Sequence, residues 1–400
     1  NLLLPVVILL GFPSFIVKGI KRGGLARNFR QRFGFFTREV QDRFSRSDSN
    51  IWIHAVSVGE VFVALKIISA IHRARPNQQI VLSTTTTTGY RVADEATLSN
   101  LIVVHTVRKR GIPVLLVNAR LSPRSERRYL KFRAMIEPVF AHITQATVPF
   151  EVDVDRWSRL GIPGENIEVT GSVKFDESPA DRPDQKIEEL RKWLAETGFP
   201  ESNRIFLAGS THDGEEILTT RIWLNLRKKY PDLSLVIVPR HAERAPGIVS
   251  QLKELGADPL TRVPSNRVES STEQGSIGDR VWISNTTGEL RAWFHLSDVV
   301  MIGKSFTGKG GQNPVEPVLA GKPVIIGPNM QNFTDVVRDL ETAEGITRAA
   351  NGEELEEQVS YFLDTPEAGR QQAERGIAAM ERHLGSADRN ARIILSADSK

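Results

Sequence analysis

The residues best suited to bind a phosphorylated ligand lie in a glycine-rich stretch in the last third of the chain. Gly308 to Glu316 reads GKGGQNPVE and follows Gly303-Lys304-Ser305. Glycines let the backbone approach a ligand without obstruction by a Cβ atom. Asn313 fits an N-cap, Pro314 the first helical position and Glu316 the reciprocal carboxylate of a capping box. The start of this helix would attract a phosphate, and Glu316 would accept hydrogen bonds from ribose hydroxyls.

A purely structural cap is the alternative, but a cap alone needs none of the crowded glycines. The stretch is not a P-loop, because no Gly-Lys-Ser/Thr closes it at the required spacing. Ser305 is a further candidate for a phosphate contact. We therefore expect a nucleotide site here and no metal or other cofactor.

Two other turns follow predicted strands and offer groups for an anion. Ser210, Thr211 and His212 precede Glu215 and Glu216, an order that fits helix capping as well as exposed N–H groups that hold an anion. Pro239-Arg240-His241 follows the run Leu235–Val238, and an arginine at a strand end suits a phosphate or a carboxylate. A surface arginine explains Arg240 equally well.

The leading candidate for a general base is Glu60 in the sequence HAVSVGE. A predicted strand ends at His54, and Glu60 opens a helix, which places its carboxylate at the sheet edge where ligands bind. It could take a proton from an attacking hydroxyl, with Ser57 and Gly59 as neighbouring contacts. Complementing the helix N-terminus is the simpler role, and for Glu60 alone it is the favoured one.

Two other patterns carry weaker signals. The run STTTTTG, Ser83 to Gly89, supplies hydroxyls that would line a sugar site or form a strand edge and a cap. Asp153-Val154-Asp155 is similar to an acidic metal motif, but it stands where a helix is expected to begin. We interpret it as a capped, solvated turn and predict no metal site.

These residues require an α/β scaffold, and the chain has the pattern of one. Short Val/Ile-rich runs alternate with amphipathic stretches, as in parallel sheets covered by helices on both faces. The predicted helices are 61–75, 186–197, 214–229 and 352–364. The predicted strands are 51–55, 80–83, 114–117, 167–170, 205–208, 235–238, 281–283, 299–302 and 324–326.

Length and composition point to two globular domains. Four hundred residues exceed what one hydrophobic core usually serves. The Pro/Asp-rich stretch 176–185 indicates a linker. We place an N-terminal domain at 47–176 and a C-terminal domain at 177–400, whose last helix is free to pack back on the first domain. The net charge of +4 excludes a dedicated nucleic-acid binder, and the lack of cysteine excludes disulfides and thiolate metal sites.

The N-terminal segment 1–46 combines an apolar run with a basic one. Residues 2–17 are apolar but interrupted, and between Lys18 and Arg46 nine Lys or Arg residues face two acids. Sixteen residues are marginal for a bilayer span, which needs about 20. Charge after the apolar run argues against a cleaved signal peptide and for an anchor with the protein on the cytoplasmic, anionic side. A buried first helix is the alternative.

Together the motifs resemble the Kdo transferase family, whose members attach 3-deoxy-D-manno-octulosonic acid (Kdo) to lipid A precursors. The resemblance covers nearly the whole chain and implies a GT-B fold: two Rossmann-like domains facing a central cleft. It also implies an N-terminal anchor in the inner membrane and CMP-Kdo as the donor. The motifs that carry it, in chain order, are HAVSVGE, STTTTTG, NARLS, TGSVKFD, GSTHDGEE, VPRH, TTGEL, GGQNPVEP and GKPVIIGP.

The resemblance also implies roles for individual residues. Glu60 looks like the general base, and Lys174 in GSVKFD is similar to the cation that stabilises the transition state. The implied reaction is an inverting transfer of Kdo to a lipid A precursor, lipid IVA. The donor has one phosphate and requires no metal. The implied CMP contacts are Pro239, Arg240, Thr287, Gly288, Glu289, Asn313, Pro314, Val315 and Glu316.

The chain departs from the family pattern at one place. Between STTTTTG and NARLS the family carries another βα unit and an E-x-E-x-W-P motif, whereas here Ser99 runs directly into Asn100. If the unit is truly lacking, a strand and an acceptor-side acid are gone. The alternatives to Kdo transfer are therefore a membrane-tethered nucleotide-sugar binder without activity, or another GT-B enzyme such as a sugar-nucleotide epimerase.

Overall fold

A computed structural model gives the structure of residues 38, 42, 50–84, 101–104, 113–141, 143–176, 183–262, 268–269 and 280–397. Its contacts divide the chain into two compact units: Asn1–Asp176 with His383–Lys400, and Glu177–Arg382. We call these unit 1 and unit 2. The last helix thus belongs to unit 1 rather than to the domain 177–400 in which the predicted boundaries place it. Apart from Arg38 and Asp42, the predicted anchor and basic segment lie outside the described residues.

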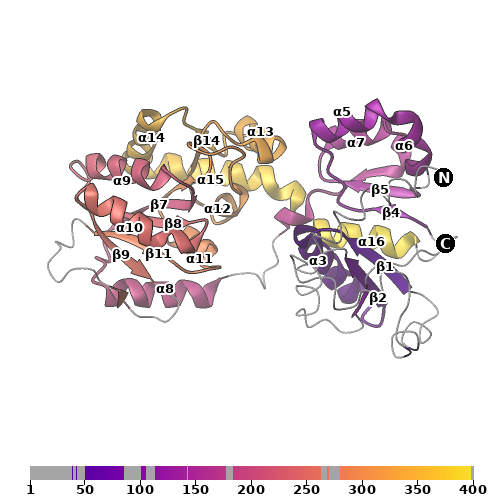
Figure 1. Cartoon of the computed structure of the whole chain (residues 1–400), viewed down its shortest axis with the longest axis horizontal. Coiled ribbons are helices and arrows are strands. Elements are labelled where there is room, and N and C mark those ends of the chain that lie inside the picture. Colours follow the sequence, from indigo (N-terminus) through magenta and orange to yellow (C-terminus); the bar gives the residue numbers. More distant parts are fainter. Residues whose placement is uncertain are drawn as a thin grey trace, which may run out of the picture. The chain divides into compact units, whose positions relative to one another are not determined.

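In unit 1 the described strands form two parallel three-stranded sheets (Figure 1). This differs from the single continuous sheet of an ideal Rossmann-like domain. The predicted strand 114–117 shortens to two residues, and the junction Ser99–Asn100, where a βα unit is expected to be missing, lies outside the described residues. One sheet contains β1 (Asn50–Ala55), β2 (Gln79–Thr84) and β3 (Leu101–Val104), and the other β4 (Leu115–Leu116), β5 (Gln145–Val148) and β6 (Ile167–Val169).

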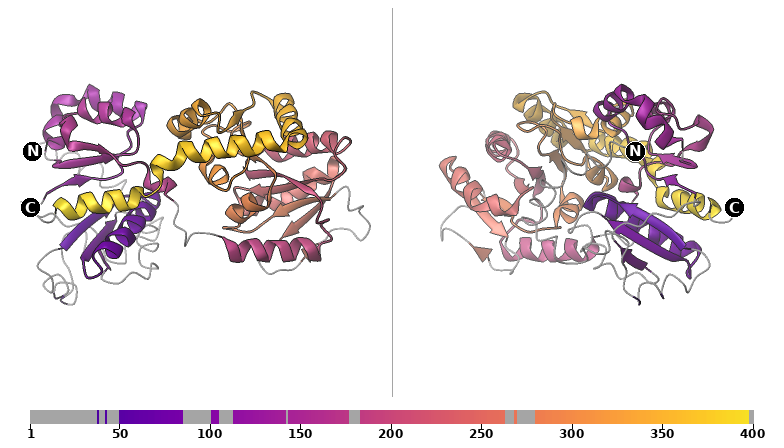
Figure 2. Two further views of the ribbon diagram at one scale, coloured as in Figure 1. Left: turned by 180° about the vertical axis from the view of Figure 1, so that it is seen from behind. Right: turned by 45° about the vertical axis from the view of Figure 1, so that its right-hand side comes forward.

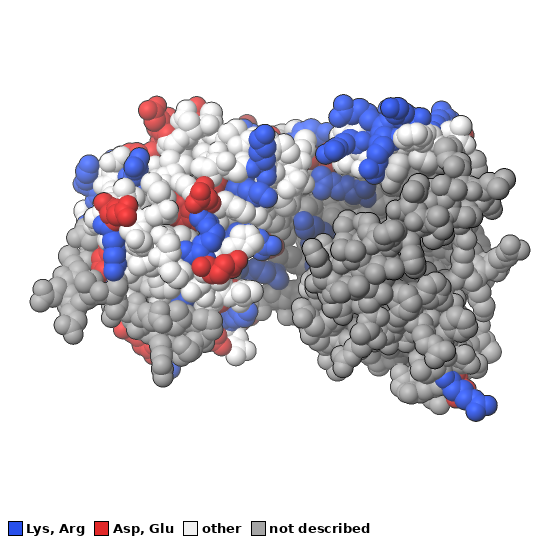
Figure 3. Space-filling model, in the orientation of Figure 1, with Lys and Arg blue, Asp and Glu red and all other residues white. Residues whose placement is uncertain are grey.

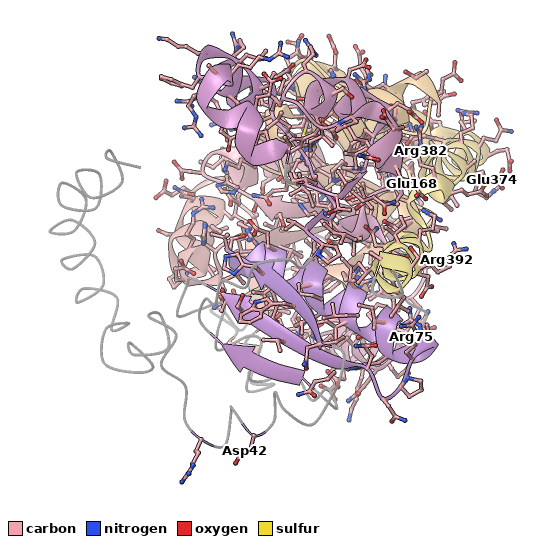
Figure 4. All side chains as sticks on the ribbon, turned by 90° about the vertical axis from the view of Figure 1, so that its right-hand side faces the viewer. Asp42, Arg75, Glu168, Glu374, Arg382 and Arg392 are labelled. Atoms are coloured by element: carbon pink, nitrogen blue, oxygen red, sulfur yellow. The ribbon has the colours of Figure 1, made fainter. Side chains whose placement is uncertain are left out.

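The helices of unit 1 include one from each end of the chain. The helix α3 buries Ile67, Ile68 and Ile71 in the same hydrophobic cluster as Ala391 and Ile394 of α16. The two helices lie side by side in Figure 2, and Figure 4 labels Arg75 at the end of α3 and Arg392 on α16. The described helices are α3 (Val58–Ala74), α5 (Pro123–Lys131), α6 (Arg133–Phe140), α7 (Glu151–Ser158) and α16 (Ser386–Ala397).

Unit 2 is built around an eight-stranded sheet in the order β10-β9-β11-β8-β7-β12-β13-β14, parallel except for the pairing of β10 with β9. Its central strands are buried along their length, which explains their continuous Val/Ile-rich runs. The strands are β7 (Arg204–Thr211), β8 (Leu233–Pro239), β9 (Asp258–Arg262), β10 (Val268–Glu269), β11 (Arg280–Ser284), β12 (Val299–Ile302), β13 (Val324–Ile326) and β14 (Thr347–Arg348).

Helices on both sides of this sheet complete the doubly wound layers (Figure 1). The indole of Trp223 on α9 is buried and donates to the carbonyl of Leu233 at 2.8 Å, which ties the helix to the start of β8. Within the described residues, none of the helices has the length and apolar character needed to cross a bilayer. The helices are α8 (Asp184–Glu196), α9 (Glu215–Leu226), α10 (Ala245–Glu254), α11 (Leu290–Leu296), α12 (Val315–Leu319), α13 (Thr334–Thr342), α14 (Gly352–Asp364) and α15 (Pro366–Met380).

Candidate active site

The strand order of unit 2 locates its ligand site. The chain leaves β7 toward β8 on one side of the sheet and later returns to add β12 on the other side. Ligands of open α/β sheets bind at such a switch point, outside the carboxyl ends of the strands. Two residues there have positive φ angles although neither is glycine: Ser210 at 58° and Lys304 at 58°. Strained backbone of this kind concentrates at functional sites.

The ends of β7 and β12 lie unusually close together. A Cβ atom added to Gly303 would meet the carbonyl oxygen of Ser210 at 2.2 Å. Only a glycine fits there, so the first residue of the predicted Gly303-Lys304-Ser305 turn serves packing between the two strands. The glycines further along are similarly crowded, since a Cβ on Gly310 would meet Asn332 at 2.4 Å and one on Gly311 would meet Met330 at 2.3 Å.

A carboxylate of the protein occupies the backbone amides that follow β12. Glu215 is completely buried and accepts hydrogen bonds from the N–H groups of Lys304 at 2.6 Å, Ser305 at 3.0 Å, Phe306 at 3.0 Å and His212 at 2.8 Å. Consecutive amides of this kind form an anion-binding nest. The chain fills the nest internally, so these amides are not available to a phosphate.

Ser305 itself does not reach a ligand, contrary to the prediction from the sequence. Its side chain is fully buried, donates to the carbonyl of Ile302 and accepts a hydrogen bond from the amide of Gly327 at 2.8 Å. Thr211 is likewise buried, and its hydroxyl donates to Glu216 at 2.8 Å. Both hydroxyls hold the loops in place instead of lining the site.

Cations surround the switch point. Arg240 is exposed at the end of β8 and forms no ion pair within the described part of the chain. His212 is half-buried, and its ring lies 5.8 Å from that of His241. Burial lowers the pKa of His212; Glu215 opposes the shift, and the positive charges of Lys304, His241 and Arg244 add to it. The basic side chains of this rim are groups that suit an anion.

Arg244 is the one member of this rim with strong carboxylate partners. It binds Glu216 at 2.7 Å, and Asp213 lies 3.3 Å away. Because Glu216 is fully buried, Arg244 neutralises a charge that would otherwise be costly to bury. We therefore assign Arg244 to the framework of the loops.

The predicted CMP contacts between Thr287 and Glu289 divide into exposed and buried residues. Thr287 and Gly288 are exposed, and the carbonyl of Gly288 accepts a hydrogen bond from Lys186 at 2.7 Å. The Glu289 carboxylate is nearly buried and pairs with Arg262 at 3.1 Å while accepting from Ser284 at 3.1 Å. Its partners hold the carboxylate inside the loop, whereas Thr287 and Gly288 remain accessible to solvent.

The predicted contacts from Asn313 to Glu316 also differ in detail from the expected cap. The helix α12 begins at Val315, with Pro314 at the N-cap position. Asn313 accepts from the amide of Val315 at 3.2 Å and donates to Glu316 at 2.8 Å, so Glu316 binds a side chain where a backbone amide was expected. Pro314 and Val315 are buried, whereas Asn313 and Glu316 are partly accessible.

In unit 1 Glu60 forms the capping box that its position suggests. Its carboxylate accepts from the amide of Val56 at 2.7 Å and from the hydroxyl of Ser57 at 3.1 Å, and the Ser57 oxygen accepts from the amide of Glu60 at 3.3 Å. Glu60 and Gly59 are nevertheless exposed. His54 lies near enough for Glu60 to raise its pKa, although burial, the larger effect, lowers it.

Lys174 lies in a short 3-10 turn, Val173–Phe175, next to α3. Its side chain is exposed and stands 6.0 Å from the ring of Phe175. The turn is held from several directions. The amide of Val173 donates to Asn118 at 3.1 Å, and the amide of Ser172 donates to the buried His383 at 3.0 Å.

The end of this turn also anchors the last helix. Asp176 accepts hydrogen bonds from the amides of Gly385 at 2.8 Å and Ala387 at 2.6 Å, at the start of α16. Its carbonyl accepts from Lys66 of α3. Glu60 and Lys174 therefore project from elements that are fixed to each other within unit 1.

Of the acidic pair near residue 153, Asp155 is exposed, as the predicted solvated turn requires, whereas Asp153 is not solvated. Asp153 is fully buried in α7 and pairs with Arg156 at 3.0 Å. Ser83 is the second-last residue of β2 and binds His54 at 2.7 Å, whereas Thr85 to Gly89 lie outside the described residues. No group of three or more His, Asp or Glu side chains able to hold a metal occurs among the residues described.

Sequence reasoning missed several residues that shape these sites. Glu215 had been interpreted as part of a helix cap, and Lys304 as one member of a glycine-rich run. Gln312 lies 3.1 Å from the ring of His212, and Asn118, with a φ of 52°, supports the turn of Lys174. The NARLS and GSTHDGEE motifs contain Asn118 and Glu215 but give no sign of their partners.

Two units of parallel α/β layers with polar groups at the strand ends fit the GT-B type of fold. Solved structures agree on the fold. A glycosyltransferase from Rickettsia africae matches with a TM-score of 0.55 and 12% identity, over 87% of this chain and 98% of that one. Anabaena HepE in complex with UDP matches with a TM-score of 0.54 and 12% identity, over 87% and 100% of the two chains.

The sequence comparisons are more specific. The family model for 3-deoxy-D-manno-octulosonic-acid transferase (kdotransferase) matches residues 27–104 and 100–177. The 3-deoxy-D-manno-octulosonic acid transferase of Haemophilus influenzae is 27% identical over 92% of this chain and 91% of its own length. That of Bordetella pertussis is 26% identical over 85% of both chains. The chain belongs to the Kdo transferase family of glycosyltransferases.

Proposed function

We propose that this enzyme transfers Kdo from CMP-Kdo to a lipid A precursor, lipid IVA, during lipopolysaccharide synthesis. The observation that carries the proposal is the cluster of cations at the switch point of unit 2, within a chain that matches its family along most of its length. A rim of basic side chains suits a donor that carries a phosphate. We infer the sugar, Kdo, from the names of the relatives.

The donor's phosphate would lie against Arg240 and His212, and its nucleoside against the exposed backbone of Thr287 and Gly288. A guanidinium and an imidazole offset the charge that develops on CMP as it leaves. The pKa of His212 is lowered in the free enzyme. A bound phosphate would raise it, because the negative charge favours the protonated imidazole, and the protonated ring would stabilise the departing CMP more strongly.

Glu60 would act as the general base. In the proposed step, an acceptor hydroxyl attacks the anomeric carbon of Kdo, its proton passes to the Glu60 carboxylate, and the bond to the CMP phosphate breaks. Attack opposite the leaving group inverts the anomeric configuration. The hydrogen bonds from Val56 and Ser57 fix the orientation of the carboxylate. Lys174 would supply positive charge to the developing transition state.

The test is the release of CMP from CMP-Kdo by the purified full chain, with and without lipid IVA. Release that requires the acceptor supports the proposal. Binding of CMP-Kdo without release under either condition would make the chain an inactive nucleotide-sugar binder. Release without acceptor at the same rate would contradict transfer to lipid.

We further propose that the enzyme works at the cytoplasmic face of the inner membrane. Besides the basic N-terminal segment, unit 1 carries exposed cations on α5 and at the start of α6 (Figure 3). Phe132 is 51% exposed among them. Cations near an anionic bilayer each contribute about 1 kcal/mol of attraction. The exposed cations are Arg124, Arg127, Arg128, Lys131 and Arg133.

Because the chain lacks cysteine, a single introduced thiol can report on this surface. We expect an environment-sensitive dye at Phe132→Cys to shift its emission on vesicles that contain anionic lipid but not on neutral vesicles. Tyr361→Cys in unit 2 is the matched control, since Tyr361 is 50% exposed. Equal responses at the two positions would contradict docking through α5.

A further inference from the structure

Lys304 has a backbone conformation that a glycine would adopt more easily. Its φ of 58° lies in the left-handed region, where a Cβ atom clashes with the backbone. The surrounding bonds enforce this conformation. The amide of Lys304 is held by Glu215 at 2.6 Å, and its carbonyl accepts from the amide of Gly311 at 3.2 Å. A lysine at a position that favours glycine suggests that its side chain has a function.

The Lys304 side chain forms no ion pair within the described part of the chain. It is half-buried, and its stem lies over Gly308, where an added Cβ would meet Lys304 Cγ at 2.7 Å. The charge of Lys304 is close enough to His212 to lower the pKa of that imidazole. The ammonium is therefore part of the rim at the switch point, and no described carboxylate neutralises it.

The loop after β12 offers an anion little else. Its amides at Lys304, Ser305 and Phe306 are bound to Glu215, and the Ser305 hydroxyl is buried. In many nucleotide-binding folds such amides hold phosphate directly. The positive groups of this loop are therefore its two lysine side chains, the half-buried Lys304 and the exposed Lys309.

We propose that Lys304 is a donor-binding residue whose ammonium contacts the single phosphate of the nucleotide. This deepens the proposed function and rests on it. The amides of residues 304–306 are bound to Glu215, so they cannot bind a phosphate. The Lys304 ammonium supplies charge for one phosphate, and these amides offer no site for a second. The arrangement would also disfavour nucleoside diphosphate donors.

The experiment measures the affinity of the full chain for CMP and for cytidine by calorimetry, together with the melting temperature. The variants are Lys304→Met, Lys304→Arg and Lys304→Gly, with Lys309→Met as the matched control, because Lys309 is an exposed lysine of the same loop. A charge-assisted contact at a partly exposed site is worth about tenfold in affinity. We expect Lys304→Met to lose about that factor for CMP and none for cytidine.

The other variants separate charge from backbone strain. Lys304→Arg should keep most of the CMP affinity. Lys304→Gly should bind CMP as weakly as Lys304→Met yet melt about 2–4 °C higher than the wild type, because the left-handed conformation no longer carries a Cβ. Lys309→Met should match the wild type in both measurements.

Four results would contradict this reasoning. Unchanged CMP affinity in Lys304→Met, or an equal loss for CMP and cytidine, would remove the phosphate contact while leaving the proposed function intact. A lower melting temperature in Lys304→Gly would refute the claim that the backbone of Lys304 is strained. Failure of the wild type itself to bind CMP would instead reject the proposed function, and this inference with it.

Discussion

Replacing Glu215 by glutamine should destabilise unit 2 far more than the loss of one surface charge would. The carboxylate accepts four N–H bonds in a fully buried position, two at each oxygen. The glutamine carbonyl can still accept the bonds from Ser305 and Phe306. Its amide group, however, would turn donors toward the N–H groups of Lys304 and His212. Each buried donor left unsatisfied costs about 1–3 kcal/mol, so we expect a loss of about 2–6 kcal/mol.

Thermal unfolding monitored by circular dichroism provides the assay. For a domain of this size, 1 kcal/mol shifts the midpoint by about 2–4 °C, so Glu215→Gln should melt at least about 4 °C below the wild type. Glu353→Gln is the control, because Glu353 also lies in the first turn of a helix but is exposed. It should change stability by less than about 1 kcal/mol. A midpoint for Glu215→Gln within 1 °C of the wild type would refute the filled nest.

Two further predictions concern the framework of unit 2. Gly303→Ala should unfold unit 2 or lower its melting point sharply, since the added Cβ would lie 2.2 Å from Ser210 O. The control is Gly247→Ala in α10, where an added Cβ would have nothing within 4 Å; it should leave the free energy of unfolding unchanged or raise it by about 0.5–1 kcal/mol. The hydrogen bond from Arg204 lowers the pKa of Asp232 below its usual 3.8, so this pair stabilises the protein above that pH and loses its effect as pH falls through the folded-state pKa. Asp232→Asn should therefore be less stable than the wild type at pH 7, by about 1 kcal/mol at most for a partly exposed pair, and the difference should shrink as the pH falls below 3.8; a difference that does not shrink would contradict the assignment.

The sequence predicted the central strands well because their signal is local. The strands 299–302 and 324–326 appear with the predicted bounds, since continuous runs of β-branched residues indicate strands buried on both faces. Strands with a mixed composition were missed. The segment Asp258–Arg262 reads DPLTR, with a proline and two charges, and it forms a strand because β11 pairs with it.

The sequence indicated candidate residues for the site but not the contacts between them. Glycines and polar residues after each strand were the candidates for ligand binding, and in unit 2 those after β8, β7 and β12 follow neighbouring strands of one sheet. The occupant of the β12 amides could not be predicted, because Glu215 and Ser305 are 90 positions apart and no local pattern links them. The prediction that Ser305 faces a ligand failed for the same reason: its buried position depends on contacts that no local pattern shows.

The most direct test of the proposed reaction compares the wild type with Glu60→Gln by mass spectrometry of the lipid acceptor. We expect the wild type to add Kdo to lipid IVA in the presence of CMP-Kdo. Glu60→Gln should bind CMP with unchanged affinity but transfer at least about 100-fold more slowly, since a general base contributes about 10²–10⁴-fold. Transfer by Glu60→Gln at the wild-type rate would contradict the account.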